Sequence, residues 1–296
     1  MFEKIVKNLE KGQINFEEAE YLLFTDDDCI NNLYQKAMDI HEDSSEKIRL
    51  ESKIFYPLIY SIKSNCPTCG YRTPESHRQY NIEYMESVIK YNIDLIKSHA
   101  ISKVNCLCID NDKNYERDLF LKSLNKQDID KAIKIENIED IKIIKKYDYH
   151  SLIVDSQNTE VLNFIQNNSE FTSDYDITIN LEVYNNNLKN NVKFINKLKN
   201  YDINSLEIIG YDPFCEDMHE YNPQYTKKYI KRTVSILKIM YPDLKLKISY
   251  ASNGNNFLEE LLPLGINCIN GIYCQNTNKL FNIEKVMTIL QKMGYK

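Results

Sequence analysis

The sequence predicts an α/β protein, a (β/α)8 barrel of the TIM type with an N-terminal helical extension. From about residue 53 onward, eight short runs rich in aliphatic and β-branched residues alternate with amphipathic helical stretches. The chain has 296 residues, enough for one large barrel, and no Pro-, Ser- or Gly-rich linker divides it. We therefore expect an extension over 1–50 and a single barrel over 51–296, with a doubly wound open sheet as the structural alternative.

The order of the expected elements follows from apolar spacing. In the extension, Phe2, Ile5 and Leu9 share a helical face, Asn15 precedes a second helix, and the acidic run 26–28 precedes a third. Apolar residues at helical spacing mark later helices, as in 82–96, 192–198 and 229–240. The third strand is the shortest, and the helical stretch 138–147 competes with it. The eight expected strands are 57–62, 103–109, 131–135, 151–155, 176–183, 205–211, 245–250 and 266–272.

Composition and missing motifs exclude several classes of protein. The 37 basic and 43 acidic residues give a net charge of -6 with mixed signs, so nucleic-acid binding is not expected. No apolar stretch is long enough for a membrane helix, and the charged first residues do not form a signal core, so we expect a cytoplasmic protein without a membrane partner. The seven glycines cannot form GxGxxG or a P-loop, and GxSxG and HExxH are absent.

Two cysteines occur in a turn after the expected first strand. Cys66 and Cys69 are three residues apart with Gly70 beside them, and such a turn can present both sulfurs to one metal. Ligands and catalytic groups of a parallel barrel lie at the C-terminal ends of its strands, so this loop is expected at the functional end. The alternative is an unligated pair or half of a structural zinc site.

The order of helical extension, strand, cysteine loop and barrel resembles the biotin synthase-like branch of the radical S-adenosylmethionine (radical SAM) superfamily over nearly the whole chain. In that family a CxxxCxxC loop holds three irons of a [4Fe-4S] cluster, and the fourth iron binds S-adenosylmethionine (SAM). The reduced cluster splits SAM into methionine and a 5'-deoxyadenosyl radical, which abstracts hydrogen from the substrate. The resemblance implies both cofactors, a small-molecule substrate, and an electron donor such as ferredoxin or flavodoxin.

The cysteine motif departs from the family pattern. Cys66 and Cys69 match the second and third family cysteines, but the first would fall at Ile62. The longer CxxxxxCxxC spacing, found in the biotin synthase-like protein of the iron-guanylylpyridinol cofactor pathway, places it at Tyr60. Cys108 is the candidate third metal ligand. It shares a strand face with Cys106, and simple burial is the alternative for both.

The resemblance also implies SAM-binding residues. Glu182 follows Asn180 and Leu181 at the end of the fifth strand, where an acidic residue of relatives bonds the SAM ribose. Thr178, Asn180 and Glu182 share one strand face, which is expected to line the barrel mouth, although Glu182 could instead be solvated. Asp110 stands near the position of a Gly-Gly-Glu that holds the SAM amino group in many relatives, and Tyr71 continues the cysteine loop as in the family.

Three functions follow from these observations. The leading hypothesis is a radical SAM enzyme of cofactor biosynthesis, and an iron-guanylylpyridinol role is one possibility within it. A degenerate barrel without a cluster would act as a binding or scaffold protein. A zinc site formed by Cys66, Cys69, Cys106 and Cys108 would be structural. The sequence does not indicate the substrate.

Overall fold

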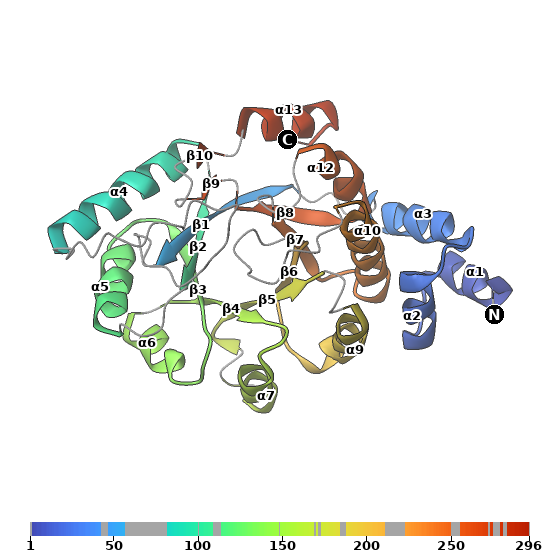
Figure 1. The fold of residues 1–296 in the computed structure, drawn as a ribbon, viewed down its shortest axis with the longest axis horizontal. Helices are drawn as coiled ribbons and strands as arrows, with labels where there is room; N and C mark the ends of the chain where they lie inside the picture. Colours follow the sequence, from blue (N-terminus) through green and yellow to red (C-terminus); the bar gives the residue numbers. More distant parts are fainter. Residues whose placement is uncertain are drawn as a thin grey trace.

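In the part of the chain that the structure describes, eight parallel strands follow one another in sequence order around a barrel (Figure 1). The computed structural model describes residues 2–42, 47–56, 82–99, 101–108, 114–147, 149–168, 170, 173–183, 188–210, 223–249, 255–271, 273–274, 279–280 and 283–295. Strand β1 pairs with both β2 and β8, with Arg49 opposite Cys268, so the ring is closed. The predicted (β/α)8 barrel is confirmed, and the open-sheet alternative is wrong.

The barrel strands are short, and seven of them lie close to where the sequence predicts them. Two further short strands, β9 (Tyr273–Cys274) and β10 (Lys279–Leu280), extend the sheet beside β1. The third strand forms in spite of the competing helical stretch next to it. The eight are β1 (Arg49–Tyr56), β2 (Lys103–Cys108), β3 (Asp130–Lys134), β4 (Ser151–Asp155), β5 (Asp176–Glu182), β6 (Ser205–Ile209), β7 (Lys245–Ser249) and β8 (Ile266–Asn270).

Helices surround the ring and cover its outer face (Figure 1). Two single turns of 3-10 helix, η1 (Leu198–Asn200) and η3 (Leu262–Leu264), follow α9 and α12. Among the described residues, no helix combines the length and apolar character needed to cross a bilayer. The surrounding helices are α4 (Ile82–Ser98), α5 (Asn114–Asn125), α6 (Asp140–Tyr147), α7 (Thr159–Asn167), α9 (Leu188–Lys197), α10 (Pro223–Met240), α12 (Asn255–Leu261) and α13 (Ile283–Lys292).

The apolar core lies between the ring and the helices. In β5, Ile177, Ile179 and Leu181 are fully buried on the outer face. Successive side chains of a strand point to opposite faces, so Thr178 and Asn180 lie on the inner face. The same alternation runs through the other strands, and it places polar side chains inside the barrel.

Three helices of the N-terminal extension pack outside the barrel. Helices α2 (Phe16–Phe24) and α3 (Cys29–Glu42) pack against α10, and α1 (Phe2–Glu10) packs against α3 on the side away from the barrel (Figure 1). Arg232 of α10 donates hydrogen bonds to the Leu23 carbonyl oxygen at 2.8 Å and to Asp26 Oδ1 at 2.9 Å. The extension is therefore anchored to a barrel helix by a buried guanidinium as well as by apolar packing.

The position of the first strand differs from the prediction. The sequence placed it at 57–62, which lies outside the described residues, whereas β1 spans Arg49–Tyr56. Charged residues at alternate positions, such as Glu51 and Lys53, weaken the sequence signal because such patterns are typical of solvated segments. In the structure these two residues are 4% and 7% exposed and their side chains bond other residues inside the barrel, which makes a strand with charged inner positions stable.

Candidate functional site

A group of polar side chains lies at the C-terminal ends of β3, β4 and β5. Lys134 Nζ is 2.7 Å from Asp155 Oδ2, and Asn180 Nδ2 donates to Asp155 Oδ1 at 3.3 Å. Burial by itself lowers the pKa of Lys134, but Asp155 and, more weakly, Glu136 and Glu182 outweigh burial and raise the pKa. The C-terminal mouth thus holds a charged lysine between carboxylates.

Glu182 belongs to this group. It ends β5 and is half-buried, on the same strand face as Thr178 and Asn180. The Thr178 hydroxyl shares a hydrogen bond of 2.8 Å with the Ser205 hydroxyl of β6, which identifies this face as the inner one. The carboxylate of Glu182 is therefore directed to the interior of the barrel mouth and not to the surrounding helices.

Asn180 has a buried acceptor atom that no described residue bonds. The residue is 5% exposed, and its Oδ1 atom has no hydrogen-bond partner among the described residues. A buried polar atom without a partner costs on the order of 1–3 kcal/mol, so such an atom in a barrel mouth is a position where a ligand hydroxyl or amine can donate. Asn180 and Glu182 therefore place two hydrogen-bond acceptors on the same inner face of β5.

Four of the predicted site residues fall outside the described part of the chain. These are the two loop cysteines, Cys66 and Cys69, and the expected SAM contacts Tyr71 and Asp110. Within the described residues, no group of three or more His, Cys, Asp or Glu side chains is arranged to hold a metal ion.

The structure places the side chain of one of the two β2 cysteines and only the backbone of the other. Cys106 is fully buried, and it lies on the face opposite Lys103 and Asn105, which bond residues inside the barrel. This places Cys106 in the core under the helices, as its burial alternative predicts. Cys108 is the last residue of β2, and its backbone pairs with Tyr56 at the end of β1; its side chain lies outside the described residues.

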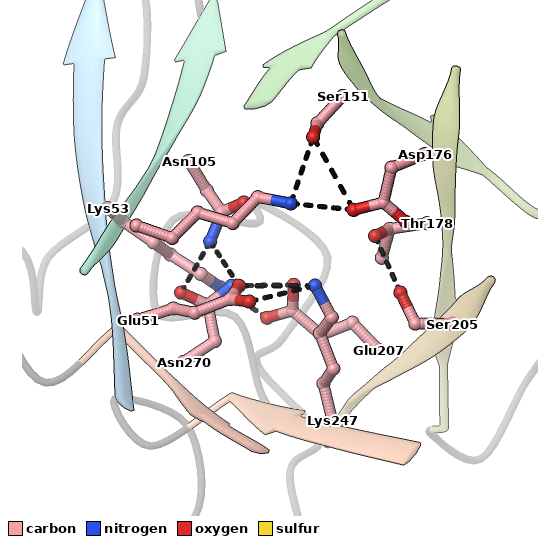
Figure 2. A network of polar contacts seen from close by, with 11 residues as sticks. Glu51, Lys53, Asn105, Ser151, Asp176, Thr178, Ser205, Glu207, Lys247 and Asn270 are labelled. Carbon is pink, nitrogen blue, oxygen red and sulfur yellow. Dashed lines mark hydrogen bonds and ion pairs between the residues drawn. The ribbon is translucent and has the colours of Figure 1, made fainter. Parts of the chain in front are cut away.

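The barrel interior contains an ion-pair network that the sequence analysis missed (Figure 2). Glu51 of β1 accepts hydrogen bonds from Lys247 Nζ of β7 at 3.1 and 3.2 Å and from Asn105 Nδ2 of β2 at 2.8 Å. Asn105 Nδ2 also donates to Asn270 Oδ1 of β8 at 2.9 Å. Side chains from four strands therefore meet around one buried carboxylate.

A second buried pair lies next to the first. Lys53 Nζ is 2.9 Å from Glu207 Oε1 and donates to Ser249 Oγ at 2.9 Å. Asn270 Nδ2 donates to the other Glu207 oxygen at 2.7 Å, which links the two pairs through one amide (Figure 2). Two lysines and two glutamates make the centre of the barrel electrically balanced, as buried charges require.

A third polar group lies toward the N-terminal end of the barrel. Lys103 Nζ donates to Asp176 Oδ2 at 2.8 Å and to Ser151 Oγ at 3.0 Å (Figure 2). The interiors of many (β/α)8 barrels are filled with branched apolar residues. This interior is polar along most of its length. The sequence signal for it is the alternation of polar with aliphatic residues in nearly every strand, which indicates a polar inner face once closure of the ring is assumed.

The protonation of the central pair follows from its surroundings. Burial by itself raises the pKa of Glu51, but the Lys247 ammonium and the Asn105 amide outweigh burial and hold this pKa below its ordinary value. Burial lowers the pKa of Lys247, and Glu51 more than reverses this, so the pKa of Lys247 is raised. Burial and the neighbouring Glu51 raise the pKa of Cys268 well above its ordinary value, so this thiol stays protonated.

The free energy of unfolding is expected to fall as the pH drops below about 4.3, the ordinary pKa of glutamate. The folded pKa of Glu51 is depressed, so its contribution is present above the unfolded pKa and is lost as the pH falls through the folded pKa. In Glu51→Gln the fall should be shallower than in the wild type, whereas Glu20→Gln, at an exposed carboxylate of α2, should keep the wild-type slope. Urea unfolding between about pH 3 and pH 6 measures the free energy of unfolding of both variants. If this free energy falls with pH as steeply in Glu51→Gln as in the wild type, the prediction is contradicted.

Comparisons with known proteins identify the fold. No family model matches the sequence, and no curated protein matches it. The chain is similar to the FeFe-hydrogenase maturase HydG from Carboxydothermus hydrogenoformans, with a TM-score of 0.74 and 15% identity over 98% of this chain and 77% of that one. It is similar to methylornithine synthase, PylB, with a TM-score of 0.68 and 14% identity over 99% of this chain and 96% of that one. A Yersinia pestis dihydropteroate synthase matches at a TM-score of 0.54 and 8% identity, over 84% of this chain and 95% of that one. At these identities the shared property is the barrel fold.

Proposed function

We propose that the protein is a radical SAM enzyme of cofactor biosynthesis that acts on a small molecule. The observation that carries the proposal is the pair Asn180 and Glu182, which presents a carboxylate and a buried acceptor without a partner among the described residues at the C-terminal mouth of the barrel. The fold is similar to those of HydG and PylB, which are radical SAM enzymes. The cysteine loop at Cys66 and Cys69 resembles that of the same superfamily.

In this proposal four residues at the barrel mouth contact SAM. When bound, the reduced [4Fe-4S] cluster supplies the electron that splits SAM. The Glu182 carboxylate and Asn180 Oδ1 would accept hydrogen bonds from the SAM ribose and orient it in the mouth. Tyr71 and Asp110 are proposed as further SAM contacts, Asp110 as an acceptor for the amino group.

Cys66 and Cys69 are proposed as cluster ligands and Cys108 as the third. The Cys108 backbone pairs with Tyr56 at the end of β1, ten residues before Cys66. By strand alternation Cys108 shares the face of Cys106, which lies under the helices, so this choice requires the chain to leave the regular strand at Cys108. An electron donor such as ferredoxin or flavodoxin would reduce the cluster. We place the enzyme in the cytoplasm and the iron-guanylylpyridinol pathway among its candidate roles.

Glu182→Gln is expected to weaken SAM binding about tenfold and to leave the iron content unchanged. The substitution removes a charge-assisted acceptor, worth about 1.5–3 kcal/mol, without changing the size of the side chain. The measurement is calorimetric titration of SAM into anaerobically reconstituted protein, together with iron and sulfide quantification. Glu160→Gln, at an exposed position of α7, is the matched control and should bind SAM like the wild type.

The same experiment separates the enzyme from a scaffold. If reconstituted wild-type protein holds no iron and does not bind SAM, the enzymatic proposal is wrong and the scaffold function of a degenerate barrel remains. If SAM binds and Glu182→Gln binds it equally well, the site has been assigned to the wrong residue.

A further inference from the structure

A cavity opens at the end of the barrel opposite Glu182. Its volume is about 980 Å³, and the first residues of β1 to β7 line it. Cavities of about this size hold small-molecule ligands in many proteins. The ion pair of Glu51 and Lys247 lies at its inner end. None of the roles proposed for SAM or the cluster uses this end of the barrel.

The lining of this N-terminal cavity is cationic although the chain as a whole is acidic. The net charge of the chain is -6, yet six Lys or Arg residues line the cavity against three Asp or Glu residues. A concave surface with one sign of charge concentrates the electrostatic field and attracts ligands of opposite charge.

Among the described residues, three of the six cations have a polar partner and three form no ion pair. Lys103 is paired with Asp176, Lys247 with Glu51, and Lys131 donates to the Gln127 carbonyl oxygen in the turn after α5. Within the described residues, the other three cations, Lys47, Arg49 and Lys245, form no ion pair and are exposed at the rim.

These three cations lie along one side of the cavity. Arg49 is the first residue of β1, Lys47 precedes it by two residues, and Lys245 is the first residue of β7; these two strands flank β8 in the ring. Like charges held on one arc repel one another, and an anion bound between them relieves that repulsion. Further inside, the Ser151 and Ser205 side chains provide hydroxyl groups for the rest of a ligand.

We propose that the N-terminal cavity is a second binding site, for a small molecule that carries a diphosphate group. The diphosphate lies against Lys47, Arg49 and Lys245, whose charges oppose its several negative charges. The guanidinium of Arg49 can donate two parallel hydrogen bonds to phosphate oxygens, and the lysines act as point charges. The polar remainder of the molecule extends toward the serine hydroxyls.

The test is calorimetric titration of inorganic pyrophosphate into the full-length protein at low ionic strength. We expect saturable binding by the wild type and at least about tenfold weaker binding by the double variant Arg49→Glu, Lys245→Glu, because the substitutions remove two of the three cationic donors and put negative charges in their place. The control variant Lys189→Glu, Lys285→Glu has the same change in net charge at exposed positions of α9 and α13 and should bind like the wild type.

A second measurement locates the binding without any substitution. Pyrophosphate should protect the amines of Lys47 and Lys245 from acetylation, as read by mass spectrometry, and should leave Lys189 and Lys285 fully labelled. Absence of saturable binding by the wild type, equal binding by the two double variants, or no protection of Lys47 and Lys245 would each overturn the proposal. Glu182→Gln should not change pyrophosphate affinity, so the proposals for this site and for the SAM site are tested independently.

Discussion

Replacing Cys66 or Cys69 by alanine is expected to abolish both iron binding and SAM cleavage in anaerobically reconstituted protein. Thiolates are the protein ligands of a [4Fe-4S] cluster, and two loop cysteines are already one fewer than the three of the CxxxCxxC motif. A single remaining loop thiolate cannot hold the cluster. Iron and sulfide content, absorbance of the thiolate-to-iron charge-transfer band, and chromatographic detection of 5'-deoxyadenosine measure the loss.

Two other cysteines provide the comparison. Cys29→Ala should keep the wild-type iron content and SAM cleavage, because Cys29 is buried in the extension outside the barrel. Cys108→Ala should give a cluster that is lost faster during gel filtration, since it removes the proposed third ligand. Full iron content in Cys66→Ala or Cys69→Ala, or iron loss in Cys29→Ala equal to theirs, would contradict the assignment of the loop.

Breaking the central ion pair is expected to destabilise the fold strongly. Glu51→Leu leaves Lys247, which is 5% exposed, without its nearest carboxylate, and removing one partner of a buried pair costs about 3–5 kcal/mol. We expect about 3 kcal/mol, the lower end of that range, because Glu207 also attracts Lys247. Equilibrium urea unfolding measures the change in the free energy of unfolding.

A double-mutant cycle and a surface pair make this prediction specific. The double variant Glu51→Leu, Lys247→Met removes both charges and should lose less stability than Glu51→Leu alone, because no unpaired charge remains buried. Glu259→Gln disturbs the exposed pair with Lys292 and should cost less than about 1 kcal/mol. A double variant that loses as much as the sum of the two single variants would show that the pair is not coupled.

The barrel could be predicted from the sequence because its signals are local. Strand and helix periodicities are properties of neighbouring residues, and seven of the eight barrel strands lie within a few residues of the predicted ranges. The same holds for the second helix of the extension, where Asn15 and Glu18 form a capping box. The inner face of β5 was also predictable, since alternation alone groups Thr178, Asn180 and Glu182.

Only closure of the ring decided the remaining features. Glu51 and Lys247 are 196 residues apart, and their pairing depends on β1, β7 and β8 being neighbours in a closed barrel. In the sequence alone, where Lys247 is not seen to pair with Glu51, the charged positions of β1 resemble those of a solvated segment. The first strand was therefore expected at 57–62, C-terminal to its position in the structure. Closure of the ring also decided that Cys106 faces the helices, because only a closed barrel gives each strand an inner face and an outer face. It likewise brought Lys47, Arg49 and Lys245 to the rim of one cavity.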